Sequence, residues 1–334
     1  MSTDNKKPRV TIYEVAKKAG VSLATVSRVI NNANNVSQEA KNKVNDVIKK
    51  LGFKPSALAQ GLATSKSFII AVVVPSANYV YISNFINGIQ EVAKNKGFKI
   101  LLLTTSHSKL DATKVIEDVI KSHVDGVIIF DDELTSDDIR NINSYSVPAV
   151  IINHNVSGET TGCILFNHDE LIRKVVLDNI SHNGIDMTFI HSHNGGRLLN
   201  KVEKAFVQVH ENSNKDYNII NCDDSYTQTY EDFKEYFKYN KKGYFIAYRD
   251  SIAAAVINAA MDNNLRIPED VQVLSIIGTK YSKIIRPNIT NFYLDFNEVG
   301  KIATSMLIDV SNNNLYKKVN KFEAKIVKYN TTIE

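Results

Sequence analysis

The sequence predicts a three-helix head with a helix-turn-helix, followed by an α/β body of two Rossmann-like lobes. Positive charge gathers at the N-terminus: residues 1–66 hold twelve Lys and Arg but only four Asp and Glu, whereas the whole 334-residue chain carries a formal charge of +4. Short amphipathic helical patterns occupy this basic front segment. From about residue 67 onward, apolar strand-like runs alternate with helical stretches.

Capping residues mark the expected helices of the head. The first helix begins at Thr11, with Glu14 three residues later as the partner in a capping box. Gly20 can adopt the positive φ that ends this helix, and Ser22 caps the second helix. A third helix starts at Ser37. Three short helices that cross at steep angles leave the second one exposed, which is the geometry that places a recognition helix in the DNA major groove.

Exposed positions on the expected second helix supply the candidate base contacts. Arg28 can form a bidentate pair with a guanine edge, while Leu23 and Ala24 can touch thymine methyl groups. Side chains that can contact phosphates surround them: Thr11, Tyr13, Ser22, Thr25, Ser27 and Asn31. The pattern by itself leaves open a small helical cap with an Arg on its surface. The basic charge favours nucleic acid as the partner.

Eight apolar runs predict the parallel sheets of the body. Strands that are apolar on both faces and alternate with helices indicate a sheet covered on both sides, with any ligand in the cleft at the carboxyl ends of the strands. The expected strands are residues 68–75, 98–105, 124–130, 147–153, 186–192, 217–222, 243–248 and 271–277. The expected helices between them are residues 81–97, 109–123, 198–211 and 250–265.

Motifs for catalysis, cofactors and membranes are missing from the sequence. It contains no G-x-S-x-G, P-loop or H-E-x-x-H, and a glycine fingerprint does not follow the first strand, so we expect no enzyme and no cofactor. No apolar run reaches the length of a membrane span, and no secretory signal is visible. We therefore expect a cytoplasmic protein in which Cys163 and Cys222 stay thiols rather than forming a disulfide.

The stretches Val10–Asn31 and Asn35–Ala63 resemble the front of the LacI/GalR family of bacterial repressors. Within that family the similarity is greatest to the catabolite control proteins of low-GC Gram-positive bacteria. The resemblance implies a DNA-binding head at 1–55 and a hinge at 56–66. It also implies a two-lobed, periplasmic-binding-protein-like effector and dimerisation body at 67–334. The first lobe would span about 67–165 and 295–323, and the second about 166–294 and 324–334.

The hinge implied by the resemblance folds only on operator DNA. Two such hinge helices enter the minor groove side by side, and Leu62 from each wedges into the central base step. Ser56, Ala59 and Gln60 join it as expected DNA contacts. The family commonly has Arg where this chain has Gln60, which weakens one expected phosphate contact. A plain linker is the alternative for this segment.

The cleft matches the family's pattern only in part. Pro75 and Asp250 agree with it, and Ser76 and the histidines His191 and His193 are further candidate cleft residues. Other positions depart: Arg249 replaces an Asn or Thr, and Gly278-Thr279-Lys280 lacks the acidic residue that accepts a sugar hydroxyl. Arg249 and Lys280 together would suit a phosphorylated sugar better than a neutral one, or the cleft has lost its ligand. The two histidines lack further ligands, so we expect no metal site.

The leading hypothesis is a homodimeric repressor of carbohydrate genes that binds a pseudo-palindromic, double-stranded operator. Its signal would be a sugar or phosphorylated sugar in the cleft, or a protein corepressor. In the catabolite control branch that corepressor is a serine-phosphorylated phosphocarrier protein, received in part by arginines in the segment corresponding to Lys280–Arg286. That loop is shortened in this chain. The alternatives are a solute-binding protein of the periplasmic class and an enzyme on Rossmann-like lobes.

Overall fold

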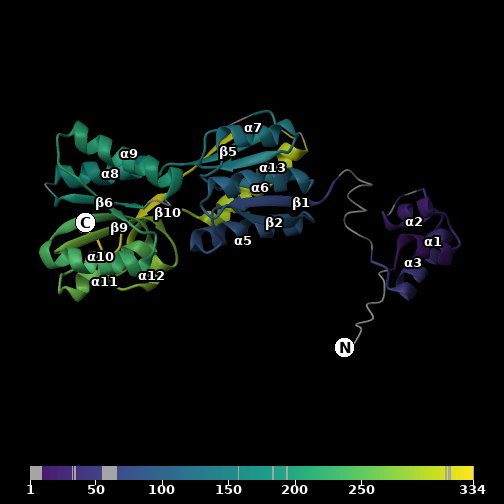
Figure 1. Ribbon diagram of the computed structural model, residues 1–334, viewed down its shortest axis with the longest axis horizontal. Helices are drawn as coiled ribbons and strands as arrows, with labels where there is room; N and C mark the ends of the chain where they lie inside the picture. Colours follow the sequence, from purple (N-terminus) through teal and green to yellow (C-terminus); the bar gives the residue numbers. More distant parts are fainter. Residues whose placement is uncertain are drawn as a thin grey trace. The chain divides into compact units, whose positions relative to one another are not determined.

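A computed structural model describes residues 10–31, 33, 35–54, 66–156, 158–182, 184–192, 195–312, 314 and 317–333. The chain divides into two compact units, residues 1–68 and 69–334. The first unit is the head, which contains α1 (Ile12–Ala19), α2 (Leu23–Ile30) and α3 (Gln38–Leu51) (Figure 1). The second unit is the body, which contains two six-stranded sheets.

The capping predicted for the head is confirmed. The Thr11 N–H donates to Glu14 Oε2 (2.7 Å) and the Glu14 N–H donates to Thr11 Oγ1 (3.3 Å), which completes a capping box. Gly20 ends α1 at a φ of +64°, and Ser22 accepts from the Thr25 N–H at the start of α2. Ser37 caps α3 in the same way. The three helices share a small core of Val15, Ala16, Val26, Val29, Val44 and Phe53.

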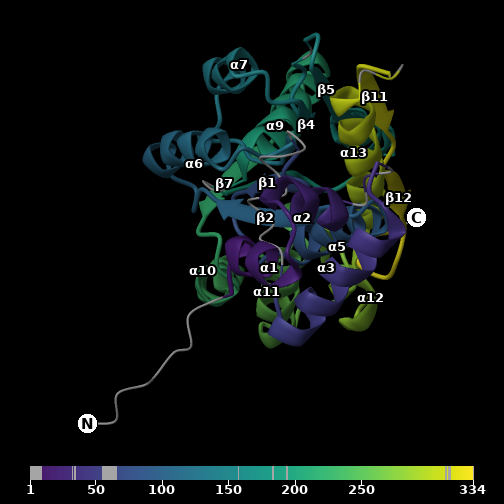
Figure 2. The ribbon, with the colours of Figure 1, turned by 90° about the vertical axis from the view of Figure 1, so that its right-hand side faces the viewer.

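The first lobe of the body is a wholly parallel sheet in the order β11-β5-β4-β3-β1-β2. Its strands are β1 (Ile69–Val74), β2 (Lys99–Thr104), β3 (Gly126–Ile129), β4 (Ala149–Ile152), β5 (Thr161–Phe166) and β11 (Val319–Phe322). α5 (Val80–Asn95) and α13 (Phe296–Ser311) cover one face, while α6 (Lys109–Lys121) and α7 (Ser136–Ser144) cover the other (Figure 2).

The second lobe has the strand order β12-β10-β9-β8-β6-β7, parallel except for the antiparallel pair β10 and β12. Its strands are β6 (Met187–Ser192), β7 (Asn218–Cys222), β8 (Gly243–Arg249), β9 (Val271–Gly278), β10 (Thr290–Tyr293) and β12 (Lys325–Val327). Its helices are α8 (His168–Ser181), α9 (Gly196–Asn212), α10 (Tyr226–Tyr239), α11 (Asp250–Asp262) and α12 (Tyr281–Ile284).

The chain passes between the lobes at three places: after β5, after β10 and after β11. At one of these crossings the Asn167 side chain accepts from the Ala324 N–H (2.7 Å), which ties two crossing segments together. The fold class predicted from the sequence, two Rossmann-like lobes behind a helical head, is confirmed. The sequence did not predict β5, β10, β11 or β12 as strands. These are the two outermost strands at one edge of each sheet, β11 and β5 in the first lobe and β12 and β10 in the second.

Two glycines set how closely α5 and α13 approach. A Cβ atom at Gly88 would lie 1.9 Å from the Asn297 carbonyl oxygen, and one at Gly300 would lie 2.2 Å from the Phe85 carbonyl oxygen. Real Cβ atoms do not approach backbone oxygens this closely, because dense packing leaves no room for the extra atom. The close pair α5 and α13 thereby joins the start of the first lobe to the late segment that returns to it.

Candidate DNA-binding face and inter-lobe cleft

Helix α2 divides into a buried side and an exposed side. Val26 and Val29 pack into the head's core, while Leu23, Ala24 and Arg28 are exposed. Leu23 has 38% of its surface exposed, which is unusual for a large apolar side chain in so small a module. No ion pair engages Arg28 within the described part of the chain. The side chains that the sequence assigned to base contacts therefore lie together on the solvent side of one helix.

The candidate phosphate contacts lie around this exposed side of α2. Thr11, Tyr13, Ser22 and Asn31 are exposed, and Thr25 and Ser27 are partly buried. The Ser22 and Thr25 hydroxyls lie 2.9 Å apart, so the cap of α2 fixes both of them. The hinge residues Ser56, Ala59, Gln60 and Leu62 lie outside the described residues. The DNA contacts assigned to all these residues remain predictions.

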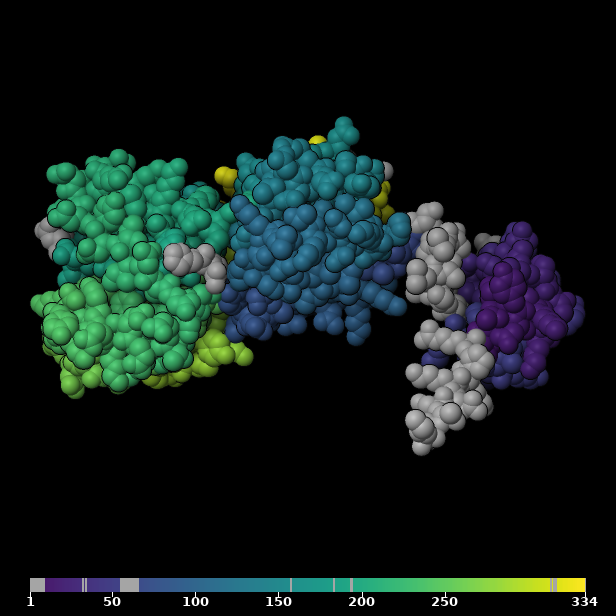
Figure 3. Space-filling view, viewed as in Figure 1, coloured from purple at the N-terminus to yellow at the C-terminus, as the bar shows by residue number. Residues whose placement is uncertain are grey.

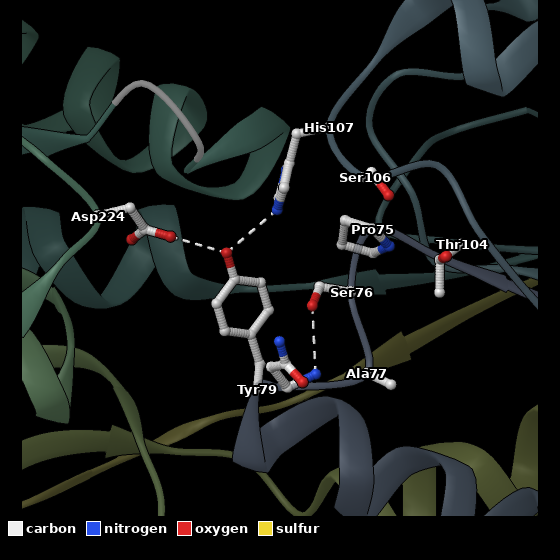
Figure 4. A pocket seen from close by; sticks show the side chains of 9 residues that line it. Pro75, Ser76, Ala77, Tyr79, Thr104, Ser106, His107 and Asp224 are labelled. Carbon is white, nitrogen blue, oxygen red and sulfur yellow. Dashed lines mark hydrogen bonds between the residues drawn. The ribbon is translucent and has the colours of Figure 1, made fainter.

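A cavity of about 540 Å³ opens where the two lobes meet (Figure 4). The first lobe contributes the segments that follow β1 and β2, and the second lobe contributes Asp224, which follows β7. This position, at the carboxyl ends of parallel strands, is where α/β sheets usually bind ligands. The lining residues are Pro75, Ser76, Ala77, Asn78, Tyr79, Thr104, Ser106, His107 and Asp224.

Tyr79 reaches from the first lobe to the second across this cavity. Its hydroxyl donates to Asp224 Oδ2 (2.7 Å), and His107 Nε2 lies 3.1 Å from the Tyr79 hydroxyl oxygen, within hydrogen-bonding distance (Figure 4). Burial, followed by the hydrogen bond to Asp224, raises the pKa of Tyr79 well above its ordinary value, so this phenol keeps its proton.

Arg249, at the end of β8, is already neutralised. Its guanidinium forms an ion pair with Asp224 and lies 4.2 Å from the centre of the Tyr79 ring. The two charged side chains expose only 9% and 8% of their surface. The Ser192 hydroxyl adds a further donor to Asp224 Oδ1 (3.3 Å). Arg249 therefore does not offer a free cation to a phosphorylated ligand.

The remaining candidate cleft residues have other partners. Asp250 Oδ2 accepts from the Thr279 N–H (2.8 Å), the Thr279 hydroxyl (2.6 Å) and the Ser282 hydroxyl (3.2 Å). Lys280 is exposed beside the Tyr281 ring, and the structure does not pair it with Arg249. His191 Nδ1 lies 2.6 Å from Glu203 Oε2 and does not line the cavity. His193 lies outside the described residues.

A second contact across the lobes was missed by sequence reasoning. Arg197, in the first turn of α9, donates to the carbonyl oxygens of Asp132 and Leu134, and its Nη1 lies 2.6 Å from His154 Nδ1. Its Nε lies 3.7 Å from Asp132 Oδ1. Burial raises the pKa of Asp132 to about 6, against the opposing effect of Arg197. The same loop leads into α7, which begins with a capping box of Thr135 and Asp138.

The described ranges contain neither a metal centre nor a helix that could span a membrane. No group of three or more His, Cys, Asp or Glu side chains among those residues could hold a metal ion. None of the described helices is long and apolar enough to cross a membrane. Cys163 and Cys222 are both buried, and neither forms a disulfide.

Comparisons with known proteins match the head and much of the body to two different family models. Residues 11–56 match the family model of bacterial regulatory proteins of the lacI family, and residues 180–328 match a periplasmic binding protein-like domain. Catabolite control protein A of Staphylococcus aureus (strain COL) is 26% identical over 314 residues, which cover 93% of this chain and 95% of that protein. The protein of the same name from Staphylococcus epidermidis is 24% identical over 332 residues, which cover 97% and 99%.

Solved structures show the same fold. The lac repressor dimer, crystallised with operator and the anti-inducer ONPF, has a TM-score of 0.82 at 22% identity and covers 98% of this chain and 100% of its own. The transcription regulator CcpA of Lactococcus lactis has a TM-score of 0.68 at 14% identity, covering 79% and 99%.

A helix-turn-helix head joined to two lobes of parallel sheet defines a DNA-binding transcriptional regulator. The chain belongs to the LacI family of bacterial regulatory proteins, a non-enzymatic family.

Proposed function

We propose that the chain represses carbohydrate or catabolite genes as a homodimer on a pseudo-palindromic operator. The observation that carries this proposal is the exposed side of α2, where Leu23, Ala24 and Arg28 lie opposite the buried Val26 and Val29. One helix of this size fits the major groove, and two copies related by two-fold symmetry fit two half-sites. The names of the staphylococcal relatives support catabolite genes as the target class.

The proposal assigns the rest of the chain supporting roles. Residues 1–55 form the head, and residues 56–66 form a hinge that orders on operator DNA, with Leu62 as the wedge in the minor groove. The body, residues 67–334, pairs the two copies and receives the regulatory signal. The protein acts in the cytoplasm, where its DNA lies.

The test is fluorescence anisotropy of a labelled pseudo-palindromic operator, titrated with the full chain at fixed salt and compared with a scrambled duplex. We expect at least about a thousandfold preference for the operator, the usual lower bound for a specific protein–DNA complex. Leu62→Ala reduces the bend of the operator more than it reduces binding to the scrambled duplex. Equal affinity for both duplexes contradicts the proposal.

The same assay examines the protein corepressor. Adding serine-phosphorylated phosphocarrier protein tightens operator binding if the shortened loop near Lys280–Arg286 still receives it. Tight binding that the carrier does not change indicates a local repressor instead. The operator preference decides the proposed function in either case, because it is measured without the carrier.

A further inference from the structure

We propose that the inter-lobe cleft is bridged by the protein's own side chains, so that the lobes are held together without a small-molecule effector. This inference rests on the proposed function, since it concerns how the same regulator receives its signal. Two sets of contacts carry it. The Tyr79 cluster consists of Tyr79 and His107 from the first lobe with Asp224 and Arg249 from the second. The Arg197 bridge joins Arg197 of the second lobe to Asp132, Leu134 and His154 of the first.

The Tyr79 cluster occupies the position from which a ligand would contact both lobes. Tyr79 precedes α5, and its phenol extends to Asp224 in the second lobe (Figure 4). Asp224 receives two hydroxyl donors, from Tyr79 and Ser192, besides its ion pair with Arg249. A ligand that replaced either Asp224 or Arg249 as the partner of the other would have to break a buried ion pair, which is costly because it separates two charges in a poorly hydrated site.

The Arg197 bridge engages the first lobe through backbone as well as side chains. Arg197 donates to two carbonyl oxygens of the loop after β3, at Asp132 and Leu134, and one of its nitrogens also lies beside His154. Guanidinium groups are suited to such sites because their fixed fork of donors can satisfy several acceptors at once. The space-filling view shows the two lobes of the body in direct contact (Figure 3).

A third contact between the lobes is aromatic. Tyr81 of α5 and Tyr248 of β8 interact through a side-chain hydrogen bond, and both residues are buried, at 5% and 6% exposed. Burial raises the pKa of Tyr81 to about 12, so the phenol stays neutral. These two tyrosines therefore add a buried contact between the lobes.

The acidic side chains of the cleft are also engaged. Asp131 accepts from the Thr105 hydroxyl (2.5 Å), Asp132 pairs with Arg197, Asp224 with Arg249, and Asp250 accepts from Thr279 and Ser282. Recognition of a sugar relies on polar groups that the protein leaves available to the ligand's hydroxyls. The cavity that remains is lined by Ser76, Asn78, Thr104 and Ser106 together with Pro75, Ala77 and three members of the Tyr79 cluster, Tyr79, His107 and Asp224.

The chain provides a matched control for each bridge. Tyr230 donates to Asp262 with Lys234 over its ring at 5.2 Å, which repeats the Tyr79 arrangement of phenol, carboxylate and cation within one lobe. Arg266 forms a bidentate pair with Asp270, also within one lobe. Tyr230→Phe and Arg266→Ala thus remove the same kinds of contact without touching the cleft.

The experiment compares hydrogen–deuterium exchange of the full-length wild type with that of Tyr79→Phe, Arg197→Ala and the two controls. We expect amides in the loops at 75–79, 131–135 and 223–225 to exchange about fivefold faster or more in the two bridge variants, and not in the controls, because cutting a bridge raises the population of open lobes. Exchange that stays the same in Tyr79→Phe overturns the inference. This substitution removes one hydroxyl and keeps the ring, so folding is preserved.

A ligand panel supplies the second measurement. Operator affinity of the wild type is titrated by anisotropy with neutral sugars and sugar phosphates at millimolar concentration. We expect each to change the operator Kd by less than about twofold, since no effector is needed to set the lobes. A shift of about fivefold or more with any of them overturns the inference. If the wild type shows no operator preference, the proposed function fails, whereas the exchange comparison still decides on the bridges.

Discussion

Replacing Arg249 with Met should destabilise the body strongly, although Arg249 is not an expected DNA contact. The substitution keeps an unbranched chain of similar length and removes the guanidinium. Asp224 then remains buried with hydroxyl donors from Tyr79 and Ser192 but with no positive charge. Since both members of the ion pair expose less than a tenth of their side chains, solvent can do little to stabilise the remaining carboxylate.

The magnitude follows from the cost of leaving one buried charge unpaired, about 3–5 kcal/mol. Stacking of the guanidinium on Tyr79, at 4.2 Å from the ring centre, adds a contribution of roughly 0.5–2 kcal/mol that is lost as well. For a unit of this size each kcal/mol lowers the melting temperature by roughly 2–4 °C. The two contributions together are about 3.5–7 kcal/mol, so we expect Arg249→Met to lower the melting temperature by about 7–28 °C.

Differential scanning calorimetry of the full chain measures this effect. The double variant Arg249→Met with Asp224→Asn removes both charges and keeps hydrogen-bonding capacity, so it should recover most of the loss. Arg266→Met, which breaks a pair whose Arg side chain is 70% exposed, should lower the transition much less than Arg249→Met does. The reasoning is refuted if Arg249→Met lowers the melting temperature by less than about 3 °C, or if the double variant is no more stable than the single one.

Three further predictions concern the head, the first lobe and the pH response. Arg28→Ala should weaken operator binding by about 5- to 150-fold, which corresponds to the loss of one bidentate guanine contact. Binding to a scrambled duplex, measured by the same anisotropy assay, should change little. An equal loss on both duplexes would contradict a base-specific contact of Arg28. Gly88→Ala should cost about 1–3 kcal/mol or more, measured by chemical denaturation, because its Cβ would overlap the Asn297 carbonyl. Burial raises the pKa of Asp132 to about 6. The wild type should therefore lose stability relative to Asp132→Asn as pH rises from about 4 to 6, and stability-versus-pH curves of the two proteins that run parallel would contradict this prediction.

The sign of the Asp132 prediction follows from its environment. A carboxyl group whose pKa is raised on folding binds its proton more tightly in the folded than in the unfolded chain. Stability contributed by the proton is then fully present below the unfolded pKa and is lost as pH rises through the folded value. Asp131, Glu133 and Arg197 are the charged neighbours that act on this group. Replacing Asp132 with Asn removes this titration, so the difference between the two stability curves gives the contribution of Asp132 to the pH dependence of stability.

The head was predictable because its determinants are local. Each cap joins residues three positions apart, as Thr11 and Glu14 do, and Gly20 ends its helix by its own backbone conformation. The alternation of apolar runs and helices predicted the parallel lobes for a similar reason, since buried strands need apolar side chains on both faces. The strand β11 was not predicted because its sequence, VNKF, is short and the strand is partly exposed at a sheet edge.

The bridges across the cleft depend on partners that the sequence keeps apart. Asp224 follows β7 and Arg249 ends β8, and Arg197 meets the carbonyl oxygen of Leu134 from the other lobe. Arg249 departs from the residue type expected at its position, and the sequence left open whether its charge serves an anion or the cleft has lost its ligand. β7 and β8 both pair with β6 in the second sheet. Their registers bring Asp224 and Arg249 close enough to form an ion pair, so the charge of Arg249 is not open to an anion.

The two bridges share no side chain, yet they should act as a unit. If the lobes open as rigid bodies, one motion breaks the Tyr79 cluster and the Arg197 bridge together, so cutting either bridge favours the same open state. Arg197→Ala should then speed exchange in the loop at 75–79, and Tyr79→Phe should speed exchange in the loop at 131–135. Because the free energies of opening add, two effects of about fivefold each should multiply to roughly 25-fold in the double variant. If each substitution speeds exchange only in the loop that it contacts, the two bridges open independently of each other. The prediction that the lobes open as rigid bodies is then wrong.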